Sequence, residues 1–471
     1  MERISRNYGE NVAHFRERLR VAENFDVVER HLSVGEDELT LFYIDGFIKD
    51  GVMLRLMQNF CSMKGLYRGE KDACRRFADS NVPYVEVERT SDAAHLTMMV
   101  MSGAAMVLGS TFGDEAIVID ARTYPARTTQ EPENDRVMQG ARDGFVETLI
   151  FNTALIRRRI RDPHLTMEYT TVGGESQTDV VLCYMQGRAD EKLLSRLRKK
   201  LKEIAPTHIT LGTESLTEAL IRRRWYNPFP KVRTTERPDT AAAELLEGRV
   251  LLLCDTSPQV MILPTSIFDF MQETDDYYFP PLTGCYLRLV RHGVFFLSLI
   301  ITPLWYLFIL YPDYVPASLL FLLPKETTAV PILLQLYLAE MAIDGLKLAS
   351  MNTPNMLAGS LSIIGGLILS DFAVEVGWLS PEVILYMAFA AIASFTQQNH
   401  ELGYAFKFLR VIILTLTAIF GIWGFAVGLA LVPILLATNK TLDGGHGYLY
   451  PLIPWNGKAM ARLFFRLKKE K

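Results

Sequence analysis

The sequence predicts two α/β subdomains at the N-terminal side, followed by an α-helical polytopic membrane domain. Up to about Cys285 charged residues recur every few positions, whereas long apolar runs begin at Gly293. The chain of 471 residues is 49% hydrophobic and 22% charged, with a mean hydropathy of +0.14, which is unusually apolar for a purely soluble chain. The expected parts are residues 1–130 and 131–285 for the two α/β subdomains, 286–440 for a transmembrane domain of four to six spans, and 441–471 for a basic cytosolic tail.

Short apolar runs and helical spacing define the first subdomain. Leu39–Ile44 is a strand that ends in an Asp-Gly turn, and Asp50–Phe60 has its apolar residues on one helical face. Asp92 is the expected N-cap of a helix over Ala93–Val107, and Ala116–Asp120 is a further strand.

The second subdomain has the same kinds of signal. A helix is expected over Arg142–Ile160, ending before Pro163. The other expected elements are a buried strand at Val180–Tyr184, an amphipathic helix at Glu191–Ile204, and a hairpin of Val250–Cys254 with Val260–Leu263.

A weak internal repeat links the two subdomains. In each, a capped helix is followed by a glycine and then by two apolar strands. The two series are Ser91–Ala94, Gly103, Met106–Leu108 and Ile117–Ile119, and Pro238–Ala241, Gly248, Val250–Leu253 and Val260–Ile262. Duplication of a small α/β unit and chance similarity both account for this pattern.

Five apolar segments are long enough, or nearly so, to cross a bilayer, which requires about 20 residues per helix. They are Gly293–Tyr311, Val330–Leu348, Leu357–Val376, Pro381–Thr396 and Phe408–Ala437. The last is long enough to be tilted or broken near Gly421–Gly428, and Gly424 and Gly428 form a GxxxG packing step. Ala317–Leu323 is too short to span and is expected at an interface or in a re-entrant loop.

The positive-inside rule conflicts with an odd number of crossings. The first thirty residues contain no apolar core of signal-peptide length, and Arg288 and Arg291 precede the first span, so a cytosolic start is expected. The basic C-terminal tail should also be cytosolic. One candidate is therefore re-entrant, or the long last one turns back.

Several classes of function are disfavoured. A net charge of −4 argues against nucleic-acid binding. The five cysteines are far apart, which indicates a reducing compartment and disfavours a zinc site or a disulfide framework. No nucleotide-binding, metalloprotease or serine-hydrolase motif is present, so we expect no enzyme activity, no cofactor and no metal.

An ordered series of motifs resembles that of a known family. The motifs are Glu131–Glu133 (EPE), Gly140–Glu147 (GARDGFVE), Asn152–Ile160 (NTALIRRRI), Tyr226–Pro230 (YNPFP), Thr235–Pro238 (TERP), Leu246–Val250 (LEGRV) and Ala390–Phe395 (AAIASF). From about residue 25 onward the sequence resembles the GerA family of spore germination proteins. Cys254–Pro258 and Ser380–Tyr386 resemble one branch of it, and Leu323–Thr328 departs from the small-residue, Arg-containing loop of germinant-receptor A subunits.

The resemblance implies a multi-pass subunit of a germination complex in the spore inner membrane or cell membrane, with its soluble region on the cytosolic or core side. It implies a homo-oligomeric ion channel that releases monovalent cations and works with other membrane subunits of the germination machinery. The alternatives are a nutrient-germinant receptor A subunit, a non-conducting sensor or scaffold, and a secondary transporter, for which no inverted repeat is evident.

Small residues and carboxylates in the membrane segments are the candidate pore or gating residues. In Leu357–Val376 small residues recur every four positions, which suits either close helix packing or the lining of a pore. The candidates in this segment are Gly359, Ser362, Gly366, Ser370, Asp371 and Glu375. Glu340 and Asp344 lie one turn apart in another span, where either an Asp344–Lys347 pair or an acidic ring that favours cations is expected.

The motif region of the second subdomain supplies candidate subunit contacts. Arginines at the end of a helix complement its dipole and are expected to pair with Glu131, Glu133 or Asp162, or to contact a subunit or lipid headgroups. The candidate contact residues are Arg142, Glu147, Arg157 and Arg158.

Overall fold

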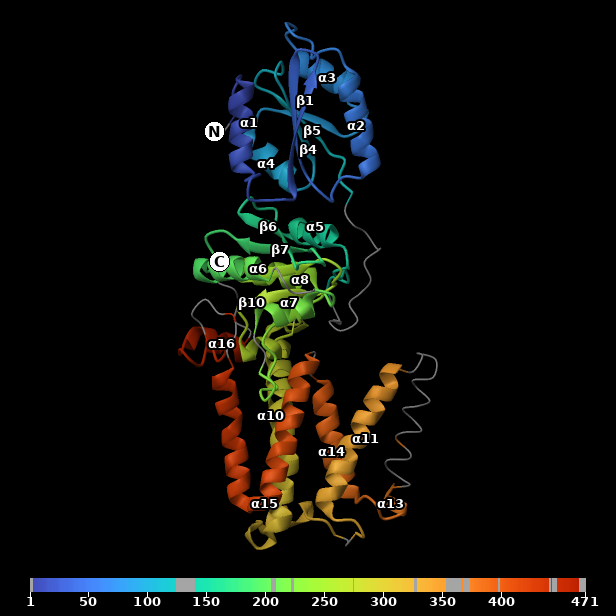
Figure 1. Ribbon diagram of the computed structural model, residues 1–471, viewed down its shortest axis with the longest axis vertical. Coiled ribbons are helices and arrows are strands. Elements are labelled where there is room, and N and C mark those ends of the chain that lie inside the picture. The colour runs from blue at the N-terminus through green and yellow to red at the C-terminus, as the bar shows by residue number, and fades with distance from the viewer. Residues whose placement is uncertain are drawn as a thin grey trace. The chain divides into compact units, whose positions relative to one another are not determined.

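The computed structural model describes residues 3–123, 140–204, 209–221, 224–273, 275–325, 328–352, 366, 373–396, 399–439, 442 and 447–465. The chain forms two compact units. Unit 1 comprises Met1–Arg223, Val232–Thr265 and Thr441–Gly445, and unit 2 comprises Arg224–Lys231, Ser266–Lys440 and His446–Lys471. Unit 1 is the α/β part and unit 2 is helical (Figure 1).

The first half of unit 1 is an antiparallel five-stranded sheet with helices on both faces. The strand order is β1-β2-β4-β5-β3. The elements are α1 (Tyr8–Arg18), β1 (Val27–Val34), β2 (Asp37–Ile44), α2 (Asp50–Ser62), α3 (Ala73–Asn81), β3 (Val87–Thr90), α4 (Ala93–Met101), β4 (Ala105–Gly109) and β5 (Ala116–Ile119).

The predicted helix over Ala93–Val107 is too long by six residues. Its start is confirmed, because Asp92 Oδ1 accepts hydrogen bonds from the backbone of Ala94 and His95 at 2.8 and 3.1 Å. The helix ends at Met101 because Gly103 adopts φ = +100°, a left-handed conformation that suits glycine. The chain then enters β4.

The second half of unit 1 has the same construction. Its strand order is β6-β7-β9-β10-β8, again antiparallel throughout. The elements are α5 (Leu149–Arg159), β6 (Leu165–Val172), β7 (Thr178–Met185), α6 (Glu191–Glu203), α7 (Thr213–Leu220), β8 (Arg233–Thr235), α8 (Pro238–Leu246), β9 (Val250–Cys254) and β10 (Val260–Leu263).

The helix expected over Arg142–Ile160 begins later, at Leu149. The Asn152 side chain accepts a hydrogen bond from Val146 N at 2.8 Å and donates one to Val146 O at 2.5 Å. These two bonds hold the chain before α5 in a non-helical turn, which is a common use of asparagine.

The two halves of unit 1 are structural duplicates. Both run α-β-β-α-α-β-α-β-β along the chain and arrange their strands in the same order. Gly103 and Gly248, at φ = +100° and +91°, both separate the last helix of a half from its two final strands. The agreement over nine elements favours duplication over chance similarity.

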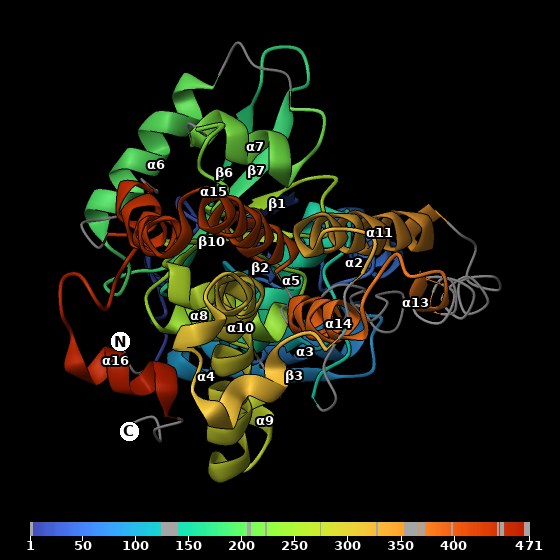
Figure 2. The same ribbon diagram turned by 90° about the horizontal axis from the view of Figure 1, so that it is seen from below.

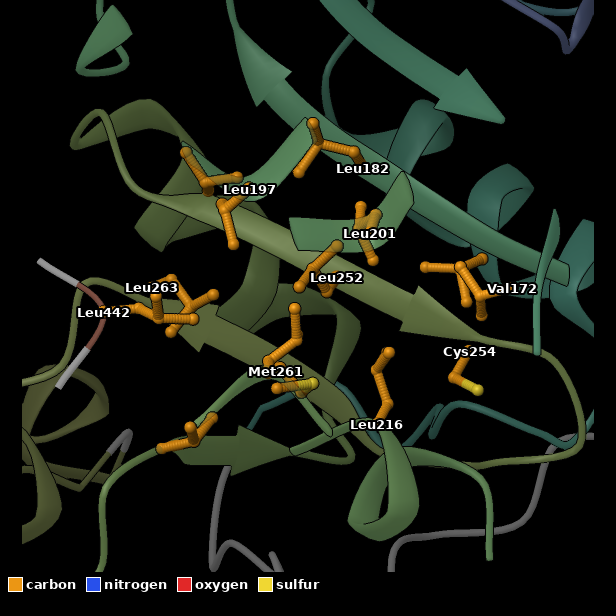
Figure 3. Close-up of a cluster of buried hydrophobic side chains, with 14 of the residues drawn as sticks. Val172, Leu182, Leu197, Leu201, Leu216, Leu252, Cys254, Met261, Leu263 and Leu442 are labelled. Carbon is orange, nitrogen blue, oxygen red and sulfur yellow. The ribbon is translucent and has the colours of Figure 1, made fainter. Parts of the chain in front are cut away.

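Apolar residues on alternating faces of each sheet build its cores. In β2, Phe42 faces a core closed by α1 and α4, and Leu41 faces one closed by α2 and α3. In the second sheet the corresponding helices are α5 and α8 on one face and α6 and α7 on the other. Figure 3 shows the latter core, where Leu197 and Leu201 of α6 and Leu216 of α7 meet Leu252 and Met261.

Unit 2 begins with short elements that lead into a 30-residue helix. Its elements are the 3₁₀ helix η1 (Ile267–Met271), α9 (Asp275–Tyr278), α10 (Pro281–Leu310), the 3₁₀ helices η2 (Pro312–Tyr314) and η3 (Ala317–Leu322), α11 (Ile332–Asn352), α13 (Ala373–Glu375), α14 (Pro381–Phe395), α15 (His400–Thr438) and α16 (Gly457–Phe464). Among the described residues, α10 and α15 are long and apolar enough to cross a membrane, and α14 is a shorter apolar helix.

Four of the five expected spans coincide with helices of unit 2, namely α10, α11, α14 and α15. The fifth, Leu357–Val376, lies mostly outside the described residues. The segment expected at an interface or in a re-entrant loop, Ala317–Leu323, contains the short helix η3.

Helix α15 is a hairpin whose two arms meet at Gly421. This glycine adopts φ = 60° and ψ = −134°, which interrupts the helix. A Cβ on Gly424 would collide with the carbonyl of Leu416, and one on Gly428 would lie 3.3 Å from Ile413 Cβ. Moving along the second arm from Gly424 to Gly428, the contacted residue in the first arm moves backwards from Leu416 to Ile413. The two arms are therefore antiparallel. Of the two alternatives, the last segment therefore turns back, and the GxxxG step packs its arms together.

A cross-linking prediction tests this hairpin. With Cys61 and Cys285 replaced by Ser, the pair Ile413→Cys and Gly428→Cys should form an intramolecular disulfide, because a Cβ–Cβ distance of 3.3 Å is close to the disulfide range. A straight helix would separate these residues by about 22 Å. Mass spectrometry after thiol alkylation measures the bond. The control pair Ile412→Cys and Gly428→Cys should stay reduced, and equal reactivity of the two pairs would contradict the hairpin.

Candidate functional site

Side-chain contacts fix the directions of the helices in unit 2. Phe295 and Ser298 of α10 contact Phe406 and Arg410 of α15, so α10 and the first arm of α15 are parallel. Helix α11 is antiparallel to that arm, since its carboxylates meet α15 in reverse order. Helices α11 and α14 are parallel. Gln335 Oε1 accepts from Ser380 N at 2.8 Å near their starts, and Lys347 Nζ donates to Ser394 Oγ at 3.0 Å near their ends.

A charged cluster joins α10, α11 and α15. Arg410 Nη2 donates to Glu340 Oε1 and Oε2 at 2.7 and 2.9 Å, and its Nη1 donates to Ser298 O at 3.3 Å. Lys407, one turn earlier, pairs with Asp344 and lies 3.8 Å from Glu340. The arginine and glutamate side chains are 8% and 13% exposed. Two carboxylates thus meet two cations inside the helical unit.

This pairing differs from one of the two alternatives expected for Asp344, a pair with Lys347. Lys347 instead donates to Ser394 on α14. Asp344 and Lys407 meet because α11 and the first arm of α15 are antiparallel, which the sequence pattern did not indicate. Burying a charge without a partner is expensive, so the four groups form a unit that stabilises the packing of three helices. The acidic-ring function of Glu340 and Asp344 stays a prediction.

The segment with small residues at four-residue spacing is largely outside the described residues. Gly359, Ser362, Ser370 and Asp371 are in this class, so their predicted role in a pore or in helix packing stays a prediction. Gly366 is described as helical and exposed. Glu375 ends the short helix α13 and is exposed.

A second buried charge cluster lies at the start of α10, and the sequence pattern did not indicate it. The Asp276 side chain is fully buried and accepts from Arg288 Nε at 2.9 Å and from Arg291 Nη1 at 3.1 Å. Arg291 also pairs with Glu273. The two arginines were expected only as cytosolic flanking charges of the first span. Their burial shows that they anchor α9 to α10, and a hydropathy count contains no signal for such an anchor.

Arg157 holds the two halves of unit 1 together. Its guanidinium, fully buried, donates to the carboxylate of Asp26 at 2.9 and 2.8 Å, to Asn24 Oδ1 at 3.3 Å and to Leu165 O at 3.0 Å. Asn24 Oδ1 also accepts from Met167 N at 2.9 Å. The expected partners were Glu131, Glu133 or Asp162. Arg157 is therefore not available on the surface, whereas the other candidate subunit contacts, Arg142, Glu147 and Arg158, are exposed.

Comparisons with known proteins agree with the family motifs. A family model described as Bacillus/Clostridium GerA spore germination protein matches residues 13–471. Stage V sporulation protein AF of Bacillus subtilis (strain 168) is 37% identical over 99% of this chain and 94% of its own length. Spore germination protein KA of the same strain is 28% identical over 98% of this chain and 85% of its own length. The resemblance to the GerA family is thus confirmed, and the branch that the sequence resembles is that of stage V sporulation protein AF.

One solved structure is similar to part of the chain. It is the N-terminal domain of the A subunit of the Bacillus megaterium spore germinant receptor GerK3. It is 23% identical, with a TM-score of 0.41, and the match covers 55% of this chain and 95% of that one.

Proposed function

Because the chain belongs to the GerA family of spore germination proteins, we propose that it is a membrane subunit of the germination machinery that conducts monovalent cations as a homo-oligomer. Unit 1 faces the cytosol or spore core, and unit 2 spans the spore inner membrane or cell membrane. Other membrane subunits of the machinery are its partners. Family membership supports the assignment to the germination machinery. The helices of unit 2 support the placement in a membrane.

Exposed aromatic residues at both ends of unit 2 support the membrane placement. Tyr286 lies in the second turn of α10 and is 65% exposed, and Trp455, which directly precedes α16, is 69% exposed. Tyr314 follows the end of α10 in η2 and is 86% exposed, and Trp423, two residues after the Gly421 that lies against Tyr311, is 76% exposed. The helix from Tyr286 to Leu310 is about 36 Å long, which fits the distance between the two interfacial regions of a bilayer. Exposed Trp and Tyr at two such levels match the aromatic belts of membrane proteins.

Helix directions support an even number of crossings. Helix α10 and the first arm of α15 run one way, and α11, α14 and the second arm of α15 run the other way. With Leu357–Val376 as a further crossing between the parallel helices α11 and α14, the six crossings alternate in direction. The basic C-terminal residues and unit 1 then face the same side, as the positive-inside rule requires.

The buried charged cluster is the single observation that most directly supports the proposed conduction of cations. Ionisable groups at membrane depth are costly and mark ion paths or partner contacts. Glu340, Asp344, Lys407 and Arg410 hold three helices together. In the proposed channel, Gly366 borders the ion path together with Gly359, Ser362 and Ser370. Asp371 and Glu375 then attract cations at one end of that path.

Two other functions remain in competition. The family includes spore germination proteins such as KA, so a nutrient-germinant receptor A subunit is the first alternative. A non-conducting sensor or scaffold is the second, since a charged cluster that is fully paired also serves packing alone.

Cation flux from vesicles that contain the purified chain, alone and with its partner subunits, tests the proposal. Asp371→Asn should change the flux while the oligomer keeps its size, whereas Gly366→Leu should abolish flux or assembly. An oligomer that never conducts with its partners present contradicts the channel and favours the scaffold. A nutrient that binds the non-conducting chain favours the receptor. Flux that neither substitution changes places the path elsewhere.

A further inference from the structure

Helix α16 lies across one end of the helical unit. It contacts α10, and Figures 1 and 2 both show it roughly perpendicular to that helix, which Figure 2 views end-on. Its N-cap is Asn456, whose Oδ1 accepts from Ala459 N at 3.1 Å. A helix perpendicular to spanning helices, at the level where they end, has the geometry of an interfacial helix.

The segment that leads into and out of α16 exposes large apolar side chains. Ile453, Trp455 and Phe465 are 60%, 69% and 58% exposed, and Leu452 is 43% exposed. Leu463, by contrast, is only 5% exposed. The segment therefore packs one side on unit 2 and presents apolar groups on another. Grouped exposed apolar side chains mark a contact with another molecule or with a membrane.

Positive charge accompanies these apolar groups. From Lys458 to the C-terminus the sequence has six basic residues and one acidic residue, Glu470, so this stretch carries +5 in a chain whose net charge is −4. The six are Lys458, Arg462, Arg466, Lys468, Lys469 and Lys471. Basic clusters on an amphipathic helix at the membrane surface bind anionic phospholipid headgroups, with about 1 kcal/mol per Lys or Arg near the surface.

We propose that the segment Leu452–Phe465 binds the bilayer surface and is selective for anionic phospholipid headgroups. Trp455 and Ile453 enter the headgroup region, Lys458 contacts the lipid phosphates, and the net positive charge of the sequence after Lys458 adds to the attraction. The proposal rests on the membrane placement of unit 2 given above. A lipid surface, and not another protein, is the proposed partner because exposed apolar side chains, net positive charge and a helix in the interfacial plane occur together in one segment.

Fluorescence of the full chain in nanodiscs tests this binding. One variant keeps Trp455 as its only tryptophan, with Trp225, Trp305, Trp378 and Trp423 replaced by Phe, and a reference variant keeps only Trp423. Each is measured in phosphatidylcholine discs and in discs that also contain phosphatidylglycerol. Lipids brominated near the headgroup should quench Trp455, and acrylamide should quench it about two-fold less in the anionic discs. Replacing the six basic residues by Gln, or raising the salt concentration, should remove that difference.

Three results would overturn the proposal, and they are distinguishable. If acrylamide quenches Trp455 strongly in both discs and lipid does not quench it, while lipid quenches Trp423, the segment does not bind lipid, although unit 2 is in the membrane. If lipid quenches neither tryptophan, the membrane placement itself fails. If Trp455 is shielded from acrylamide in both discs without lipid quenching, a protein surface covers it instead.

Discussion

Replacing Asp26 with Leu should lower the free energy of unfolding of unit 1 by about 3–5 kcal/mol, since Arg157 then remains as a buried charge without its counterion. The Arg157 side chain is fully buried and that of Asp26 is 2% exposed, so solvent cannot replace the lost carboxylate. The double variant Asp26→Leu, Arg157→Leu should recover most of the loss. Hydrogen exchange of peptides from β4 and β9, followed against urea in the full chain, measures the effect.

A matched exposed pair provides the control for this experiment. Arg75 lies 3.6 Å from Asp79 in the same subdomain as Asp26, but the two side chains are 63% and 68% exposed. Arg75→Ala should therefore change stability by about 1 kcal/mol or less. If Asp26→Leu were as mild as this control, the Asp26–Arg157 pair would not be what joins the two halves of unit 1.

Replacing Glu340 with Gln should destabilise unit 2 by about 3 kcal/mol, because Arg410 loses its bidentate partner among the helices. The change should appear as a lower melting temperature of the detergent-purified chain. Replacing both Glu340 and Arg410 with Leu should restore much of the stability. Glu382, a partly exposed carboxylate in the first turn of α14, provides the control, and Glu382→Gln should have little effect.

The same variant separates two roles of Glu340. If Glu340 acts through its pair with Arg410, Glu340→Gln lowers the melting temperature. Cation selectivity is then lost only to the extent that the protein unfolds. If Glu340 belongs to an acidic ring around a pore, the variant keeps its melting temperature and loses cation selectivity. Unchanged stability would therefore contradict the structural role assigned to the charged cluster.

Local patterns in the sequence predicted local structure well. The apolar run Leu39–Ile44 and the spacing in Glu191–Ile204 correspond to β2 and α6, and the internal repeat corresponds to two sheets of the same strand order. The predicted helix ends were wrong where a single side chain or glycine overrides the periodic pattern. Gly103 ends α4 early, and the hydrogen bonds of Asn152 delay the start of α5.

Long-range partners could not be predicted from spacing. Asp26 and Arg157 are 131 residues apart, and Glu340 and Arg410 are 70 apart, so only the folded chain shows that they pair. An isolated sequence indicates that a charge in an apolar segment needs a partner but does not identify it. The hairpin at Gly421 was one of two alternatives, and the left-handed conformation of that glycine decided between them.

An oligomer of this chain should conduct cations, and the reversal potential of its current tests this most directly. Purified protein, with its partner subunits, is placed in a planar bilayer between KCl solutions that differ tenfold in concentration. A cation-selective path should reverse its current near the potential of potassium, about 59 mV in magnitude. An assembled complex that carries no current, or one whose current reverses at the opposite sign, would contradict the account.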